Sequence, residues 1–279
     1  MRKVIVTTVL GTLLAGVVLT MHLAAPIWGA EKNVAKVRPD KSATVQTVAK
    51  SKPAGRSVGE IRSQLKGAMG TDKIVFIRRR TLNPNHYYTE HINSEFKPGG
   101  GICILDLNDG SVREFSMPKP GVVNRFDISY DARKIVFDFK DAHMEGYRIY
   151  ELVIKTGKIK QLTFPPKDED ALQERYKVRT LWDSNWDTYH HGESNDYHHG
   201  TDDMHPCYLP DGGIAFVSTR CKIATICDGP DIFTTTNMYR MDADGKSMRR
   251  LSRDMVSLFT PVVLPTGEIL YSRWEYVDK

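Results

Sequence analysis

The 279-residue sequence lacks the short catalytic motifs that assign common enzyme classes. It has no phosphate-binding glycine loop and no helical His-Glu-x-x-His motif, and no predicted strand runs into a nucleophile elbow. These absences leave hydrolase and nucleotide-binding functions without support. Asp202 and Asp203 are neighbours in the sequence, which does not establish the facing geometry that acid–base catalysis requires. We therefore assign no residue a catalytic role.

A basic, aromatic-rich surface is also missing from the part of the chain that we expect to fold. The formal net charge is +5, with 39 basic and 34 acidic residues. Two basic residues lie within 1–30 and nine within 31–70, which leaves 28 basic against 31 acidic residues from Thr71 onward. The excess positive charge belongs to the N-terminal segments, and we predict no nucleic-acid partner.

The N-terminus has the pattern of a secretory leader. Arg2 and Lys3 precede an apolar stretch from Val4 to Ala30, in which His22 is the only ionisable side chain. We therefore expect export to a periplasm-like compartment, with residues 1–30 as a signal peptide or an uncleaved N-terminal anchor. Residues 31–70 are rich in Lys, Ala, Ser, Val and Pro. This composition predicts a flexible basic linker, with one short helix around Gly59–Met69.

The remaining sequence repeats one turn-and-strand pattern. The strands Lys134–Lys140, Gly213–Arg220 and Glu268–Arg273 are β-branched or aromatic, and each follows a turn that contains Pro or Asp. A second hairpin follows the first two of these strands, over residues 147–163 and 237–252. Four strands per unit is typical of a propeller blade. We therefore predict an all-β fold, a partial β-propeller of four-stranded blades over residues 71–279.

The number of blades can be counted from the repeat. A first blade begins at Lys73–Arg78 and continues through Gly101–Leu107 to Phe115, and a fourth is represented only by its opening hairpin. The sequence thus indicates roughly three blades plus the start of a fourth. Propellers close at about four to eight blades, and an open ring leaves sheet edges unpaired. We therefore expect this chain to be the N-terminal portion of a longer protein.

Histidine is concentrated in an insertion at about residues 165–206. Five of the nine histidines lie between His190 and His205, and the stretch from Trp182 to Cys207 carries six carboxylates but no Lys or Arg. Packing such a run costs solvation and repulsion energy unless a cation, a cofactor or water uses its ligand capacity. These donors suit zinc at tetrahedral geometry.

The spacing does not select the ligands. Successive side chains of an extended chain point to opposite faces, so we expect at most one histidine of each adjacent pair to bind. His205 and Cys207 stand at i and i+2 on one face of the entering strand. With one histidine from each Tyr-His-His-Gly arm and a neighbouring carboxylate, the predicted metal ligands are His190, His198, His205, Cys207 and Asp202. The alternative is a solvated polar loop with Cys207 as a small buried residue.

Two tyrosines and the other cysteines leave alternatives open. Tyr189 and Tyr197, which open the two arms, either line a cofactor pocket or pack. Cys221 and Cys227 flank a five-residue loop, where a local disulfide is favoured in an exported protein and contact with a cofactor is the alternative. Cys103 lies in an apolar strand, so we expect it in the core.

The run Met204–Cys221, followed by Cys227–Asp242 and preceded by the Tyr-His-His-Gly insertion, resembles the propeller region of hydrazine synthase alpha subunits of anammox bacteria. The turn-and-strand units also resemble TolB-type propeller repeats. The first resemblance covers about residues 71–279. It implies an oxidoreductase of nitrogen metabolism that forms hydrazine from nitric oxide and ammonium at haem c, with zinc near the active haem. It also implies beta and gamma subunits as partners and an anammoxosome lumen as one possible compartment.

The haem-attachment signature of this family, C-x-x-C-H, is absent from the chain. Cys221 and Cys227 are separated by five residues, and Asp228 follows. The resemblance therefore places haem attachment outside this sequence, and we expect the fragment alone to be inactive. The alternative function is a non-catalytic, exported TolB-like propeller that acts as a protein-binding scaffold.

Overall fold

The computed structural model describes residues 56–80, 98–141, 146–171, 201–223 and 235–275, with the backbone alone at 82–83 and 95–96. The predicted leader, most of the predicted linker, both Tyr-His-His-Gly arms and Cys227 lie outside these residues. None of the helices within the described ranges is long and apolar enough to cross a bilayer.

Helix α1 (Val58–Met69) covers the segment in which the sequence predicts a helix. Ser57 caps its N-terminus: the Ser57 hydroxyl accepts a hydrogen bond from the Glu60 N–H at 3.2 Å, and the Glu60 carboxylate accepts one from the Ser57 N–H at 2.7 Å. Gly70 ends the helix with φ +62°. Residues 55–59 spell Gly-x-Ser-x-Gly, but this serine is the N-cap of a helix.

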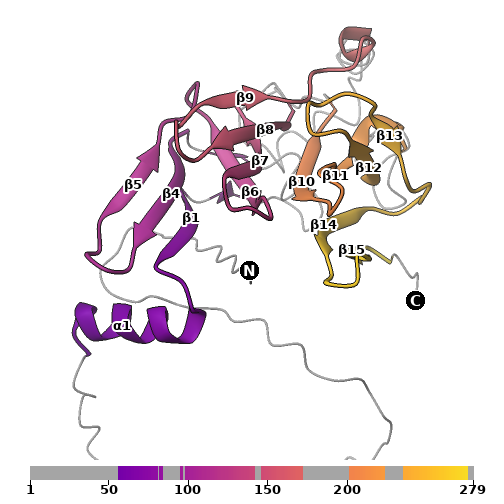
Figure 1. Ribbon diagram of the computed structural model, residues 1–279. Coiled ribbons are helices and arrows are strands. Elements are labelled where there is room, and N and C mark those ends of the chain that lie inside the picture. The colour runs from indigo at the N-terminus through magenta and orange to yellow at the C-terminus, as the bar shows by residue number, and fades with distance from the viewer. Residues whose placement is uncertain are drawn as a thin grey trace, which may run out of the picture.

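Antiparallel sheets follow one another in chain order and stand side by side as a fan (Figure 1). The predicted fold class is confirmed: apart from α1, the described residues are mostly strand, in one three-stranded sheet, two four-stranded sheets and a final hairpin that correspond to three blades and the start of a fourth. A short hairpin, β2 (Leu82–Asn83) and β3 (Glu95–Phe96), lies within the first long connection. The first sheet consists of β1 (Lys73–Arg79), β4 (Gly100–Asp106) and β5 (Val112–Phe115), and the second of β6 (Val122–Ile128), β7 (Lys134–Lys140), β8 (Arg148–Val153) and β9 (Ile159–Gln161). The third sheet consists of β10 (Asp203–Tyr208), β11 (Ile214–Ser218), β12 (Asn237–Met241) and β13 (Arg249–Arg250). The last is the hairpin of β14 (Leu258–Val263) and β15 (Ile269–Arg273).

The core lies between successive sheets. Because side chains alternate along a strand, β7 serves two layers: Phe137 packs towards the first sheet and Val136 towards the third. On β11, Phe216 packs towards the second sheet and Val217 towards the last hairpin. Cys103 is buried, as an apolar strand predicts. The second and third sheets therefore have two apolar faces, which is why β7 and β11 read as continuous hydrophobic runs.

The opening strands β6, β10 and β14 each carry a β-bulge at the same place. The register shifts between Val123 and Phe126 on β6, between Met204 and Cys207 on β10, and between Phe259 and Val262 on β14. A bulge inserts one residue and leaves its N–H without a ladder partner. At each bulge two residues stand opposite one residue of the next strand: Asn124 and Arg125, His205 and Pro206, and Thr260 and Pro261.

Candidate functional site

The three bulges bring polar groups of all four sheets into one continuous chain of hydrogen bonds. From β1, the Arg79 guanidinium donates to the Asn124 side-chain oxygen at 3.1 Å. The Asn124 amide approaches the buried Asp138 carboxylate of β7 at 3.5 Å. The same carboxylate accepts from the His205 N–H at 2.8 Å, and the imidazole Nδ1 of His205 accepts from the Thr260 N–H at 3.2 Å. We call these five residues the axial chain.

Backbone strain marks two members of the axial chain. His205 has φ +53° and Thr260 has φ +50°, in the left-handed region that residues with a Cβ seldom adopt. For a β-branched residue such as Thr260 this conformation is costly, by roughly 1–3 kcal/mol. The hydrogen bond to Nδ1 fixes the His205 tautomer, because an accepting nitrogen carries no proton. A metal bound by His205 would therefore have to use Nε2.

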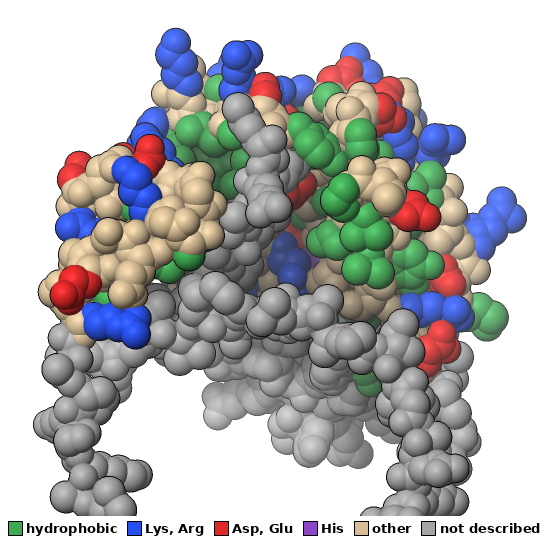
Figure 2. All heavy atoms as spheres, turned by 60° about the horizontal axis from the view of Figure 1, so that its bottom comes forward, with side chains coloured by type: hydrophobic (Ala, Val, Ile, Leu, Met, Phe, Trp, Pro, Cys, Tyr) green, Lys and Arg blue, Asp and Glu red, His purple; other side chains and the backbone are tan. Residues whose placement is uncertain are grey.

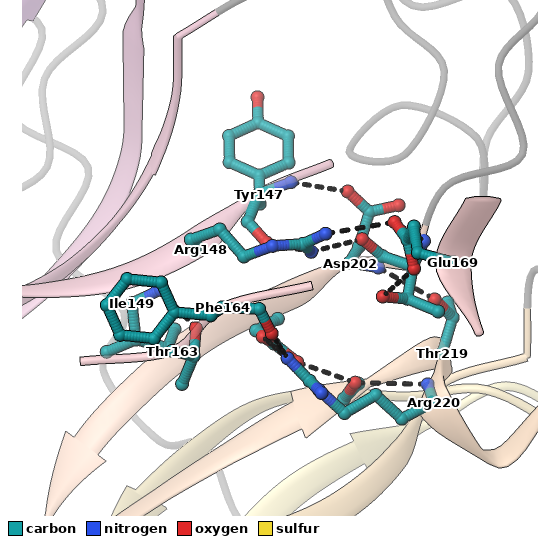
Figure 3. Close-up of polar contacts among 12 residues, drawn as sticks. Tyr147, Arg148, Ile149, Thr163, Phe164, Glu169, Asp202, Thr219 and Arg220 are labelled. Atoms are coloured by element: carbon teal, nitrogen blue, oxygen red, sulfur yellow. Dashed lines mark hydrogen bonds and ion pairs between the residues drawn. The ribbon is translucent and has the colours of Figure 1, made fainter. Parts of the chain in front are cut away.

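A second polar network closes the base of the His-rich insertion (Figure 3). Arg148, at the start of β8, forms an ion pair with Glu169 at 2.9 Å, and both side chains are buried. The Glu169 carboxylate also accepts from the N–H and the hydroxyl of Thr201, at 2.7 and 2.8 Å. The Arg148 guanidinium donates in turn to the Thr201 carbonyl. The two ends of the insertion are thereby held together, and we call Arg148, Glu169 and Thr201 the insertion clamp.

Asp203 continues the network towards the third sheet. Its carboxylate accepts two hydrogen bonds of 2.7 Å from Arg220, one from Nε and one from Nη2, and a third of 2.8 Å from the Ser218 hydroxyl. Burial alone would raise the pKa of Asp203, but the hydrogen bonds and charge of Arg220 hold it below its usual value. Arg220 also donates to the Phe164 carbonyl (Figure 3), so it ties β11 to the segment that leads into the insertion.

Asp202 is also buried, but its pKa is raised, whereas that of Asp203 is lowered. Burial raises its pKa to about 7, although the positive charge of Lys140 lowers it. Burial likewise lowers the pKa of Lys140, which lies over the Tyr147 ring at 5.8 Å. The Asp202 carboxylate accepts from the Tyr147 N–H at 2.7 Å. A carboxyl group with this pKa changes its charge around neutral pH. Figure 2 shows acidic and basic side chains set back in the hollow at the centre of the surface.

The structure places the described members of the predicted metal site in different surroundings. His205 belongs to the axial chain, and Asp202 faces Tyr147 and Lys140. Cys207 packs in an apolar cluster with Leu209 and Ala215. The bulge breaks the simple i and i+2 alternation between His205 and Cys207. Within the described residues no three His, Cys, Asp or Glu side chains converge as metal ligands. His190, His198, Tyr189 and Tyr197 lie outside the described ranges, so zinc binding stays a prediction.

The predicted disulfide also stays a prediction, because Cys227 lies outside the described residues. Cys221 ends the short 3₁₀ helix Thr219–Cys221, and its sulfur lies 3.1 Å from the Thr235 carbonyl oxygen. Burial raises the pKa of the Cys221 thiol.

Sequence reasoning missed the charged residues that build both networks. Asp138 and Lys140 lie in the apolar strand Lys134–Lys140, where a buried strand seldom carries charge. A charged residue within an apolar strand is the signal from which Asp138 of the axial chain and Lys140 could have been found. Nothing comparable points to Glu169, which lies in a polar segment and is buried through contacts with distant residues, or to Arg220, which ends a predicted strand and stays partly exposed.

No protein-family model matches the chain, and no curated protein matches it. Among solved structures it is similar to hydrazine synthase from Kuenenia stuttgartiensis, at 14% identity and a TM-score of 0.48, over 72% of this chain and 27% of that chain. It is also similar to a TolB-type protein from Agrobacterium tumefaciens, at 18% identity and a TM-score of 0.41, over 63% of this chain and 46% of that chain. TolB from Acinetobacter baumannii is similar at 12% identity and a TM-score of 0.39, over 80% of this chain and 69% of that chain. The chain thus spans less than half of the first two, and likeness at this level assigns no function.

Proposed function

We propose that this chain supplies the propeller portion of an exported, multi-subunit redox enzyme of the hydrazine synthase kind. In this proposal, the His-rich insertion forms one wall of a reaction centre that contains haem c. The reaction, condensation of nitric oxide with ammonium, comes from the resemblance of residues 204–242 to that family. The partners are subunits of the beta and gamma kind, which together with further polypeptide would carry the haem.

One observation of the structure supports the proposal most: the buried charge committed to the base of the insertion. A solvated surface loop needs no buried ion pair, because burying two charges costs several kcal/mol each before their attraction offsets the cost. Arg148 and Glu169 nevertheless meet in the interior and hold Thr201. This arrangement fits an insertion that has to leave the propeller at a defined place.

The role of this chain's own residues in the proposed enzyme is to hold and orient. The insertion clamp fixes both ends of the insertion, and Asp202 lies beside them with a pKa raised to about 7 by burial. Haem would supply the redox chemistry when bound by other polypeptide. Zinc, if present, would be held by His190 and His198 together with Nε2 of His205, since Cys207 lies in apolar surroundings among the described residues.

The decisive experiment is isolation of the native protein with an antibody against residues 201–275. The proposal expects two co-purifying subunits, the absorption bands of haem c, and hydrazine formation that requires both nitric oxide and ammonium. A chain that purifies without haem and without such activity would instead favour the scaffold function. Zinc analysis adds a second readout: His198→Ala should lower the bound zinc, whereas His86→Ala, outside the insertion, should leave it unchanged.

A further inference from the structure

Tyr147 buries a side-chain hydroxyl that forms no hydrogen bond with any described residue. The residue is 1% exposed, and its ring packs in an apolar cluster with Val122 and Met204. Its hydrogen bonds are made by the main chain: the N–H donates to the Asp202 carboxylate at 2.7 Å, and the carbonyl oxygen accepts from the Asp203 N–H at 2.9 Å. Figure 3 shows the hydroxyl pointing away from this network. A buried tyrosine hydroxyl normally has a partner, because leaving it without one costs free energy.

Arg79 brings a half-used guanidinium to the same place. Its hydrogen bonds to described residues all come from Nη1, which donates to the Val123 and Asn124 carbonyl oxygens at 3.3 Å and to Asn124 Oδ1 at 3.1 Å. Nε and Nη2 remain, the two nitrogens with which Arg220 holds both oxygens of a carboxylate at 2.7 Å. Burial raises the pKa of the Tyr147 hydroxyl, whereas the charge of Arg79 lowers it. The guanidinium and the hydroxyl therefore lie within electrostatic reach of each other.

Lys140 adds a second positive charge beside Tyr147. Its Nζ lies 5.8 Å from the centre of the Tyr147 ring, and its side chain is buried. The carboxylates of Asp138 and Asp202 also act on the hydroxyl, but both accept hydrogen bonds from main-chain N–H groups: Asp138 from two, at 2.5 and 2.8 Å, and Asp202 from Tyr147. No carboxylate of the described ranges forms an ion pair with Arg79. Tyr147 joins the second sheet to the segment that enters the third, and each of these sheets has four strands, so the hydroxyl does not lie at an incomplete sheet.

We propose that Tyr147 and Arg79 form a binding site for a small, planar oxyanion of the carboxylate kind. One oxygen of the anion accepts a hydrogen bond from the Tyr147 hydroxyl, and Nε and Nη2 of Arg79 donate to its oxygens, because a guanidinium edge matches two oxygens in one plane. Lys140 contributes positive charge without contact. A cation is repelled by Arg79 and Lys140, and a neutral molecule leaves their charges without compensation. The site requires neither haem nor the partner subunits of the proposed enzyme.

Acetate tests the proposal, with its neutral analogue acetamide as the control. The full chain is labelled with ¹³C in its tyrosine rings, and the NMR signal of Tyr147 is identified by its absence from Tyr147→Phe. We expect this signal to shift saturably with acetate but not with acetamide, with a millimolar Kd because so few atoms make contact. Arg79→Lys keeps the charge but loses the two-nitrogen edge, so it should weaken acetate binding about tenfold. Tyr208→Phe, which removes a buried hydroxyl bonded to Glu151 at 2.9 Å, should change the Kd less than about twofold.

Three results would overturn the proposal. One is the absence of a saturable shift with acetate, and another is an equal shift with acetamide; neither requires a variant beyond the one that assigns the signal. The third is a loss of stability in Tyr147→Phe, without any anion, as large as that in Tyr208→Phe, since the Tyr147 hydroxyl would then have a partner within the fold. Matching circular dichroism spectra show that Arg79→Lys and Tyr208→Phe keep their fold. The assay requires no haem or substrate, so its outcome is independent of the proposed enzymatic function.

Discussion

Glu169→Ala is expected to destabilise the protein by about 4 kcal/mol, although the residue lies outside every predicted strand. The Glu169 carboxylate accepts three hydrogen bonds: from Arg148 at 2.9 Å and from the N–H and hydroxyl of Thr201 at 2.7 and 2.8 Å. Removing one partner of a buried ion pair costs about 3–5 kcal/mol, because the remaining charge stays in the interior. Each orphaned buried donor adds about 1–3 kcal/mol. The carboxyl groups of Asp202 and Asp203 interact electrostatically with Arg148, and their attraction for its charge offsets part of this cost.

Urea unfolding followed by far-UV circular dichroism measures the effect. Glu169→Gln keeps an oxygen acceptor for Thr201 but loses the charge, so it should cost about half as much. The double variant Arg148→Met with Glu169→Leu should recover part of the loss, since no unpaired charge remains. Asp72→Ala is the matched control: its ion pair with Lys66 is 2.7 Å long but exposed, and its loss should cost less than about 1 kcal/mol. A free energy of unfolding for Glu169→Ala within about 1 kcal/mol of wild type, at an unchanged m-value, would refute the reasoning.

Three further predictions concern the same region. Because the folded-state pKa of Asp202 is raised from 3.8 to about 7, the folded protein holds a proton that the unfolded chain has released, and stability falls as the pH rises from about 4 to about 7. Asp202→Asn should remove up to about 4 kcal/mol of this fall in urea titrations across that range, and an unchanged pH slope would contradict the assignment. Gly146→Ala should lower the melting temperature by several degrees, because the added methyl group would overlap the Thr201 carbonyl; an unaltered melting temperature would show that the backbone can yield there. Tyr208→Phe should cost about 1 kcal/mol in chemical denaturation, the value of its 2.9 Å hydrogen bond to Glu151, and no loss would mean that water replaces it.

The strand order could be predicted from the sequence because its signals are local. Each turn carries Pro, Asp or Gly within four or five residues, and each following strand carries a run of β-branched and aromatic side chains. The first sheet illustrates this: the sequence places its strands at 73–78, 101–107 and 111–115, and the structure has Lys73–Arg79, Gly100–Asp106 and Val112–Phe115. Ends shifted by a residue are normal where a ladder begins or stops.

The site could be predicted only as a region, because its contacts join residues far apart in the sequence. Asp138 and His205 are 67 residues apart, Tyr147 and Asp202 are 55 apart, and Glu169 pairs with Thr201 across the whole insertion. No local pattern encodes such partners. The bulge at His205 is likewise invisible in the sequence, since an extra residue on one strand is defined only against the strand it pairs with. The expectation that His205 and Cys207 share a regular strand face rested on a ladder without that bulge.

The equivalent bulges explain how a repeated scaffold acquires one asymmetric site. All three opening strands place one extra residue at the same level, so the scaffold dictates where the ladder is interrupted. The side chains at the first bulge position differ: an amide at Asn124, an imidazole at His205 and a hydroxyl at Thr260. The imidazole is the only ring among them, and His205 links two neighbouring sheets through different atoms. Its main-chain N–H donates to the buried Asp138 carboxylate of β7, whereas its Nδ1 accepts from the N–H of the strained Thr260. Loss of the ring would therefore leave the Thr260 N–H without this acceptor, while the bond to Asp138 needs only the backbone.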